Sequence, residues 1–429
     1  MPPIALAARS NSQKFFASFF QKRCFFFLYL NLLIIILDRR SAPRLMDPTM
    51  NATPGKRILV LIPTGTVYDK DKVKWYEAAP DKVQQQYFNI GDMVVYDSTL
   101  KILDYRELDR LVVTNPTPAQ IERYKTFDYI FLRASNFVHN RMEWLSAIEV
   151  LEKVQLPVYA IGVGSQAPSR DDYKLTGDNL RIWQIISERS KLIGVRGTYT
   201  ADVLYSNGIK NIEIVGCPSL FRARRRDLQI EHPKHLDHVA FSIRRETSSG
   251  YSSDIAKYLN IQRDFLVNTM RQLNTTLTVH GEAEEKSFYY HNEPAIEVAR
   301  ERFLKSGWWT PSTAAELERL YRERIFFFLR VEDYDDFIKT QDFAFGYRVH
   351  GVLPALAQGV PGLLVKYDTR STELADSFAI PSIVLNEEAP KDVPALLRDV
   401  SFDEFNKIYP SRYDKMRFIL EQNRIPHRM

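Results

Sequence analysis

The sequence predicts an α/β protein with two doubly wound domains that face a cleft. Short apolar runs recur along the chain, and stretches with helical periodicity separate them. A basic, irregular stretch at residues 221–234 divides this series into two. Continuous apolar runs are typical of strands buried on both faces of a parallel sheet. Their alternation with helices predicts one doubly wound domain in each half.

The first domain is expected at residues 56–225. Its strands are predicted at residues 57–62, 129–132, 157–163, 192–195 and 212–215. Between the last two strands, Thr198 is the expected N-cap of a helix, and Asn207-Gly208 is its stop signal.

The second domain is expected at residues 236–400. Its strands are predicted at residues 238–243, 276–279, 325–331, 343–347, 362–365 and 382–385. A last helical pattern closes the chain and defines a C-terminal helical segment at residues 401–429.

Charge and cysteine usage exclude several classes of protein. The chain has 429 residues and two cysteines, Cys24 and Cys217, too few for a disulfide framework or a cysteine-rich zinc fold. The net charge of +5 is concentrated in residues 1–45, which carry +6, so the remainder is close to neutral at −1. Nucleic-acid binding driven by overall charge therefore has no support, and no nucleic-acid partner is expected.

Residues 24–37 are apolar except for Asn31. The run is shorter than the roughly 20 residues that cross a bilayer, and its length suits a signal-peptide core, but no small-residue cleavage site follows it. Three interpretations stay open: a leader outside the mature protein with initiation at Met46 or Met50, a membrane anchor, or a cleaved signal. Residues 1–50 are therefore placed outside the fold. The expected location is cytoplasmic, with membrane association through residues 24–37 as the alternative.

In doubly wound folds, ligands bind outside the carboxyl ends of the strands, so the residues that follow each strand are candidates for the site. After the third strand, Gly164 and Ser165 belong to a glycine-rich turn whose free backbone N–H groups are expected to face the cleft, unless the turn is merely structural. Its G-x-G-x-x-A match is a weak dinucleotide signature because Pro168 would fall inside the helix. Arg196 follows the fourth strand and precedes a helix, where it suits an anion; an exposed arginine paired with a local carboxylate is the alternative.

The other loops give weaker candidates. Arg244 follows the first strand of the second domain and is a second candidate anion binder. His280-Gly281-Glu282 follows the next strand and offers an acid or base, or else an ordinary polar loop. Cys217 is interpreted as a small buried cysteine in a tight turn, since no base partner for it is identifiable. No metal-ligand spacing is found, and no metal site is expected.

The sharpest candidate site is the strand-to-helix turn that contains Arg348 and His350. Positions two apart point in nearly opposite directions on a helix, so both side chains reach one ligand only if they lie in the turn itself. A permanent cation and a titratable imidazole at a helix N-terminus suit an anionic substrate that also exchanges a proton. A core histidine beside an arginine–carboxylate pair is the alternative.

Taken together, these motifs resemble the polysaccharide pyruvyl transferase family. In chain order they are Asn89-Ile90-Gly91-Asp92, Gly162-Val163-Gly164-Ser165-Gln166, Val195-Arg196-Gly197, Gly208, Val215-Gly216-Cys217-Pro218-Ser219, Arg348-Val349-His350-Gly351, Gly359-Val360-Pro361 and Asp368-Thr369-Arg370. They cover about residues 89 to 376, and residues 281–324 match no family motif.

The resemblance implies two Rossmann-like domains arranged as in GT-B glycosyltransferases. It also implies transfer of the enolpyruvyl group of phosphoenolpyruvate to two hydroxyls of a sugar in a glycan, giving a pyruvate ketal and phosphate without a further cofactor. Arg348 and His350 are then the catalytic residues, with an imidazole tuned near neutral pH. The expected substrate-binding residues are Arg196, Arg244, Gly164, Ser165, Asn89 and Asp92.

Two other functions stay open. A GT-B glycosyltransferase would use a nucleotide-sugar donor, and Glu373 is then the candidate that binds the ribose. A degenerate member of the family would bind glycans or partners without catalysis, which the presence of both Arg348 and His350 disfavours.

Overall fold

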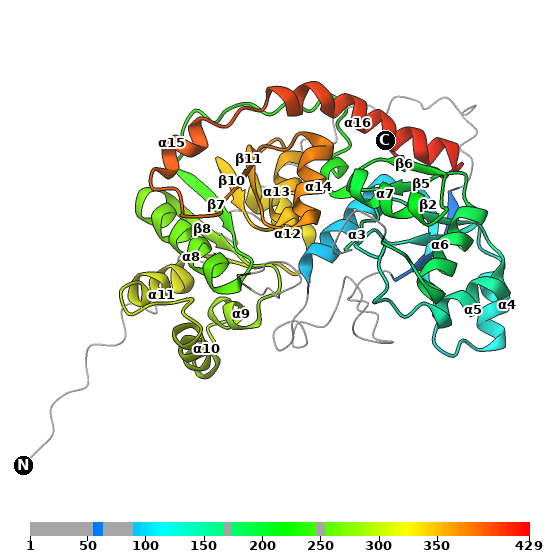
Figure 1. Ribbon diagram of the computed structural model, residues 1–429, viewed down its shortest axis with the longest axis horizontal. Coiled ribbons are helices and arrows are strands. Elements are labelled where there is room, and N and C mark those ends of the chain that lie inside the picture. The colour runs from blue at the N-terminus through cyan, green and yellow to red at the C-terminus, as the bar shows by residue number, and fades with distance from the viewer. Residues whose placement is uncertain (1–54, 63–88, 167–172, 246–253) are drawn as a thin grey trace, which may run out of the picture. The chain divides into compact units, whose positions relative to one another are not determined.

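Parallel sheets with helices between successive strands organise the chain (Figure 1). The computed structural model describes residues 55–62, 89–166, 173–245 and 254–429. Residues 54–429 belong to one compact unit. The α/β fold class is confirmed: every named strand of the described part pairs in parallel with its neighbours.

The N-terminal half, residues 55–221, contains β1 (Lys56–Leu61), α3 (Ile90–Ile102), β2 (Tyr105–Arg110), α4 (Pro118–Tyr124), β3 (Tyr129–Leu132), α5 (Leu145–Val154), β4 (Val158–Ala160), α6 (Gly177–Arg189), β5 (Ile193–Val195), α7 (Thr198–Ser206), β6 (Ile212–Ile214) and the 3-10 helix η2 (Pro218–Phe221).

The C-terminal half, residues 238–429, contains β7 (His238–Ser242), α8 (Ile255–Gln272), β8 (Asn274–Thr278), α9 (Ala283–Tyr289), α10 (Glu293–Lys305), α11 (Ala314–Glu323), β9 (Ile325–Phe326), α12 (Val331–Ile338), β10 (Phe343–Gly346), α13 (Val349–Ala357), β11 (Gly362–Lys366), α14 (Thr369–Phe378), β12 (Ser382–Val384), α15 (Val393–Arg398) and α16 (Asp403–Gln422).

The sheet of the C-terminal half has the strand order β12-β11-β10-β7-β8-β9. The order reverses between β7 and β10, whose last residues, Ser242 and Gly346, lie side by side in the ladder. Such a switch point leaves a crevice outside the carboxyl ends of the two strands, because their connections leave in opposite directions. The predicted Arg348 and His350 follow β10 directly and therefore lie at this crevice.

The N-terminal half has the order β2-β1-β3-β4, and β5 pairs with β6. A parallel bridge between Val163 and Val195 joins the continuation of β4 to β5. The strand β2 is not predicted from the sequence, because its residues, YRELDR, are mostly polar. They are half-exposed at the edge of the sheet. In the C-terminal half, the strand predicted at 325–331 is only Ile325–Phe326, since α12 already begins at Val331.

Helix α3 joins the two halves. Asn89 caps it by accepting a hydrogen bond from the Gly91 N–H at 3.1 Å. Its residues are buried on nearly all sides, because it packs against α12, α13 and η2. A helix that is buried all round belongs to a core rather than to a surface. One hydrophobic cluster therefore continues from Ile58 and Val60 of the N-terminal half into the C-terminal half.

Helix α14 makes a second junction and approaches the N-terminal half very closely. An added Cβ at Gly216 would lie 1.7 Å from Cζ of Phe378, and one at Gly197 would lie 2.4 Å from Cγ of Glu373. The Glu373 carboxylate accepts hydrogen bonds from the Thr200 N–H at 2.7 Å and the Thr200 hydroxyl at 3.0 Å. The N-cap of α7 is Gly197 rather than the predicted Thr198, and Glu373 binds the N-terminal turn from the other half of the chain.

Helix α16 returns the chain to the N-terminal half (Figure 1, red). Asn423, which follows it, accepts hydrogen bonds from the Lys191 and Leu192 N–H groups at 3.0 and 3.1 Å, and it donates one to the Leu192 carbonyl at 2.9 Å. The start of β5 is therefore satisfied by the end of the chain.

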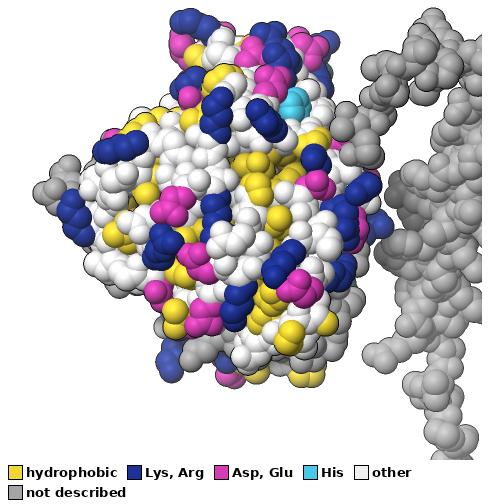
Figure 2. Space-filling model, turned by 90° about the vertical axis from the view of Figure 1, so that its right-hand side faces the viewer, with side chains coloured by type: hydrophobic (Ala, Val, Ile, Leu, Met, Phe, Trp, Pro, Cys, Tyr) yellow, Lys and Arg dark blue, Asp and Glu magenta, His cyan; other side chains and the backbone are white. Residues whose placement is uncertain are grey.

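The surface agrees with a nearly neutral body. Figure 2 shows basic and acidic side chains interspersed over one face of the molecule. No described helix is both long and apolar enough to cross a membrane. The apolar run at residues 24–37 lies outside the described residues, so its predicted membrane association stays a prediction.

Replacing Gly216 by alanine is expected to lower the free energy of unfolding by roughly 2–4 kcal/mol. Its φ of +76° disfavours a side chain, and the new Cβ would overlap the Phe378 ring. Gly208→Ala is the matched control, since φ is +86° there but nothing lies within 4 Å of the added Cβ, so about 1 kcal/mol is expected. Urea unfolding of both variants measures the difference. Equal losses would show that α14 does not press on this turn.

The stability of the protein is expected to fall below pH 6.5 partly because of His139. Burial, followed by the charge of Arg141, lowers the pKa of His139 from 6.5 to about 4. Between these values the unfolded chain binds a proton that the folded chain does not, so stability decreases as pH falls, by at most about 1.4 kcal/mol per pH unit. Urea unfolding of His139→Gln from pH 7 to 4.5 should give a shallower decrease than the wild type. His235→Gln, at an exposed histidine, is the control, and an unchanged slope in His139→Gln would contradict the assignment.

Candidate functional site

A tight strand-to-helix turn presents the two central residues of the site. The turn brings Gly346 against β7. The φ of Gly346 is +126°, and a Cβ added to it would lie 2.4 Å from the Ser242 carbonyl oxygen, so a side chain would not fit there. Tyr347 N–H donates to that carbonyl at 2.8 Å, and Arg348 N–H donates to the Ser242 hydroxyl at 3.3 Å. Arg348 is the N-cap of α13, and His350 lies in its first turn. Both residues thus lie in the strand-to-helix turn, as the sequence predicts.

The Arg348 side chain is 6% exposed and forms an ion pair with Glu282, whose side chain is 0% exposed. Its Nε also donates to the Ile243 carbonyl at 3.0 Å, and Glu282 accepts from the His280 N–H at 3.0 Å. Burial alone would raise the pKa of Glu282, but the Arg348 guanidinium outweighs it and the pKa is lowered. From the sequence, Glu282 is either an acid or base or part of an ordinary polar loop. In the structure its carboxylate is the ion-pair partner of Arg348.

The half-buried ring of His350 lies between parts of both halves. Its Nε2 is 3.6 Å from Sγ of Cys217, and an added Cβ on Gly91, at the start of α3, would lie 3.0 Å from its Nδ1. Cys217 is buried in a turn, as predicted. The sequence identifies no base partner for Cys217, because a contact across 133 positions leaves no signal in the local sequence.

Positive charge converges on His350. Its pKa is lowered well below 6.5, first by burial and then by the charges of Arg196, His280, Arg370 and Arg133. The expectation of an imidazole tuned near neutral pH is therefore wrong for the ligand-free protein. A bound anion would offset these charges and raise the pKa again.

Arg196 is buried, at 3% exposed, which contradicts the alternative of an exposed arginine. Its Nε donates to the Gly162 carbonyl at 2.9 Å and its guanidinium donates to Asn136 Oδ1 at 2.7 Å. Gly164 makes room for this arrangement, since an added Cβ there would lie 2.5 Å from Asn136 Oδ1 and 2.9 Å from Cδ of Arg196. Both partners are neutral, so no described carboxylate balances the charge of Arg196.

The glycine-rich turn does not offer the free N–H groups that the sequence predicts. The N–H groups of Gly162, Val163 and Gly164 donate to backbone carbonyls, and the Ser165 N–H donates to the Thr200 hydroxyl at 2.8 Å. The Ser165 hydroxyl donates to the Val138 carbonyl at 2.8 Å. The turn is built to position Arg196.

Arg133 is a buried residue near the site that none of the sequence motifs marks. It is the first residue after β3, where the carboxyl-end rule should have found it. Its guanidinium lies 3.1 Å from Asp92 Oδ1, so this predicted residue holds an arginine. Asn89, also predicted, acts as the N-cap of α3.

Arg244 and Arg370 lie on the side of the C-terminal half. Arg244 is half-buried, with its Cζ 5.3 Å from the centre of the Tyr367 ring. Arg370, at the start of α14, donates from Nε to Asp368 Oδ2 at 2.8 Å. The sequence marks Arg370 only as part of the Asp368-Thr369-Arg370 motif and not as a site residue.

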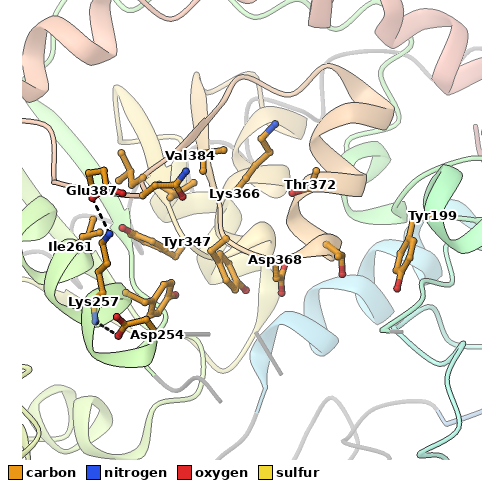
Figure 3. Close-up of a pocket in the computed structure, with 16 residues that line it drawn as sticks. Tyr199, Asp254, Lys257, Ile261, Tyr347, Lys366, Asp368, Thr372, Val384 and Glu387 are labelled. Carbon is orange, nitrogen blue, oxygen red and sulfur yellow. Dashed lines mark hydrogen bonds and ion pairs between the residues drawn. The ribbon is translucent and has the colours of Figure 1, made fainter. Parts of the chain in front are cut away.

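A pocket of about 970 Å³ lies at the carboxyl ends of β10, β11 and β12 (Figure 3). Its walls include Tyr258, Tyr347, Tyr367, Asp368 and Lys257. None of the predicted site residues lines it, although Tyr347 immediately precedes Arg348. Among the described residues, no group of three or more His, Cys, Asp or Glu side chains is placed to hold a metal ion.

Solved structures of similar fold share little sequence with the chain. A UDP-N-acetylglucosamine 2-epimerase has 12% identity and a TM-score of 0.43, over 86% of this chain and 95% of its own. MnaA of S. aureus in complex with UDP has 12% identity and a TM-score of 0.38, over 86% and 91%. WaaG, a glycosyltransferase involved in lipopolysaccharide biosynthesis, has 10% identity and a TM-score of 0.31, over 76% and 91%.

No curated protein matches the chain significantly. The sequence model of polysaccharide pyruvyl transferases does match it, over residues 89–369. This range contains Asn89 at the start of α3, the turn that positions Arg196, and the turn with Arg348 and His350. The match covers more than half of the chain, and the chain therefore belongs to the polysaccharide pyruvyl transferase family.

Proposed function

We propose that the protein transfers the enolpyruvyl group of phosphoenolpyruvate to two hydroxyls of one sugar in a glycan. The products are a pyruvate ketal and phosphate. The observation that supports this most strongly is the convergence of Arg196, Arg370 and Arg133 on His350. Phosphoenolpyruvate carries a carboxylate and a phosphate, and arginine guanidinium groups bind both in bidentate fashion.

Arg196 is the proposed primary anion binder. The other arginines near His350 are already balanced, since Arg133 lies against Asp92, Arg348 against Glu282 and Arg370 against Asp368. Arg196 has only neutral partners among the described residues. A buried charge without a counter-ion is costly, so a bound anion would stabilise it.

The proposed reaction balances without a further reactant. One sugar hydroxyl adds to C2 of the donor and the second displaces phosphate, while C3 of the donor becomes a methyl group. Of the two hydroxyl protons, one is transferred to C3 and the other leaves with phosphate. His350 is the proposed acid and base, and the negative charge of the bound donor raises its pKa so that it can carry a proton.

His350→Asn is expected to lower product formation at least about 100-fold while the protein stays folded, because the shuttled proton loses its carrier. Phosphate release from phosphoenolpyruvate with a glycan acceptor measures turnover, and thermal unfolding checks the fold. His427→Asn, at a histidine near the end of the chain, is the control. Near-normal turnover of His350→Asn would contradict the assignment.

The role of Arg348 is tested by replacing it together with its ion-pair partner Glu282. Arg348→Met alone would leave the Glu282 carboxylate buried without a counter-ion, which costs about 3–5 kcal/mol. The double variant Arg348→Met, Glu282→Gln removes both charges and is expected to fold but to form no product. If the double variant turns over normally, Arg348 has no part in catalysis.

The pKa of His350 is expected to rise when phosphoenolpyruvate binds. It is also expected to rise in ligand-free Arg196→Met, because a positive charge that lowers it is removed. Titration of the imidazole by NMR of ¹³C-labelled histidine measures both changes. Arg226→Met, which removes the partner of Asp414, is the control and should leave the pKa of His350 unchanged. A pKa insensitive to the donor would show that it binds elsewhere.

The structure offers less support for a nucleotide-sugar donor. Glu373, the predicted ribose ligand, is buried and binds the first turn of α7 through Thr200. Phosphoenolpyruvate should therefore raise the melting temperature and UDP-glucose should not, since a ligand that binds only the folded state stabilises it.

We also propose that no metal is required, so turnover should persist in EDTA.

A further inference from the structure

We infer that the pocket at the carboxyl ends of β10, β11 and β12 binds the sugar acceptor as a neutral polyol. This inference rests on the proposed function and adds to it the place of the acceptor. The pocket adjoins the donor region, since its wall residue Asp368 holds Arg370, one of the arginines that act on His350. A second wall residue near the donor region is Tyr347, which precedes Arg348 in the turn.

The charges of the pocket disfavour an anionic ligand. The described lining residues include three carboxylates, Asp254, Asp368 and Glu387, and two lysines, Lys257 and Lys366, but no arginine. Lys366 is paired with Asp376 at 3.5 Å. Lys257 is 3.0 Å from Glu387 and neutralised by it (Figure 3). A donor with two anionic groups is therefore favoured at the arginines around His350, and a neutral ligand is favoured here.

The helix ends of the pocket point to the same conclusion. Free helix N-termini attract phosphate groups, but both termini here are occupied. Asp254 Oδ1 accepts from the Lys257 N–H at 2.9 Å at the start of α8, and Asp368 Oδ1 accepts from the Ser371 N–H at 2.8 Å at the start of α14. A nucleoside diphosphate would meet carboxylates at both ends. Sugar hydroxyls, in contrast, can donate to them.

Aromatic rings supply the apolar part of the wall. Tyr258 lies with its ring centre 5.5 Å from that of Tyr347 and 5.6 Å from that of Tyr367. The C–H face of a pyranose ring is apolar and packs on such rings while its hydroxyls reach polar groups. The volume of about 970 Å³ lies at the upper end of the usual range of roughly 300–1,000 Å³ for ligand pockets, which leaves room for more than one sugar ring.

Tyr347 provides an independent indication of a ligand. Its side chain is 2% exposed, and its hydroxyl has no hydrogen-bond partner among the described residues. Buried polar atoms without a partner are rare in folded proteins, and each one calls for a physical reason. A sugar hydroxyl in the pocket would supply the missing partner.

The first test separates the acceptor from the donor. Tyr347→Phe keeps the ring and removes the hydroxyl, so it is expected to raise KM for the acceptor roughly 2- to 10-fold and to leave KM for phosphoenolpyruvate within about twofold. Tyr129→Phe is the matched control, because its hydroxyl is also buried with no hydrogen-bond partner in the described part of the chain but lies on β3. An unchanged acceptor KM in Tyr347→Phe, or a change only in the donor KM, would overturn the inference.

The second test fills the pocket. Val384 lines it and is 55% exposed, so Val384→Trp obstructs the pocket without disturbing a core. Val298→Trp, at a 48% exposed valine of α10, is the control. Calorimetric titration with the methyl glycosides of galactose, glucose, mannose and N-acetylglucosamine should show binding of at least one to the wild type and to Val298→Trp. Val384→Trp should weaken that binding at least about tenfold.

Calorimetry also distinguishes failure of this inference from failure of the proposed function. If the wild type releases no phosphate from phosphoenolpyruvate but binds a methyl glycoside in a manner that Val384→Trp abolishes, the donor is wrong and the sugar pocket stands. If no methyl glycoside binds the wild type, or if UDP-glucose binds and Val384→Trp abolishes that binding, the sugar pocket is overturned.

Discussion

The buried ion pair of Arg348 and Glu282 determines the geometry of the site. It spans three neighbouring strands, because Arg348 follows β10, Glu282 follows β8, and the carbonyl of Ile243, which accepts from Arg348 Nε, follows β7 between them. Burying two charges costs several kcal/mol, which hydrogen bonds must offset. The pair therefore tolerates little movement, and it fixes the switch point from which α13 and His350 begin.

The site is shared between the two halves of the chain. His350 comes from α13, but Cys217 and the start of α3 touch its ring from the N-terminal half, and Arg196 and Arg133 supply much of the charge that acts on it. The division of charge has a chemical meaning. Arginines act on the imidazole, whereas three carboxylates, two lysines and tyrosines line the adjoining pocket, and the proposed anionic donor and neutral acceptor are assigned to these two places on that basis.

The sequence predicted what depends on local pattern. Buried strands are recognisable in the sequence as apolar runs. Because ligands of such folds bind outside the carboxyl ends of the strands, the predicted strand at 343–347 indicates Arg348 and His350 as site residues. Contacts between distant segments could not be predicted in this way: Glu282 opposite Arg348, Cys217 beside His350, and Glu373 on the first turn of α7. Each pairs residues that are far apart in the chain, and a single sequence carries no sign of such partners. The edge strand β2 was missed because its polar residues lack the apolar pattern.

The return of α16 to the N-terminal half has a consequence for biosynthesis. The amides of Lys191 and Leu192 acquire their partner from Asn423, which follows them in the sequence by 232 and 231 residues. Domains generally fold as units while the chain emerges from the ribosome. Here the N-terminal half can build most of its sheet early in synthesis, but these hydrogen bonds must wait until Asn423 has left the ribosome. Until then, that margin of the nascent protein remains open to chaperones.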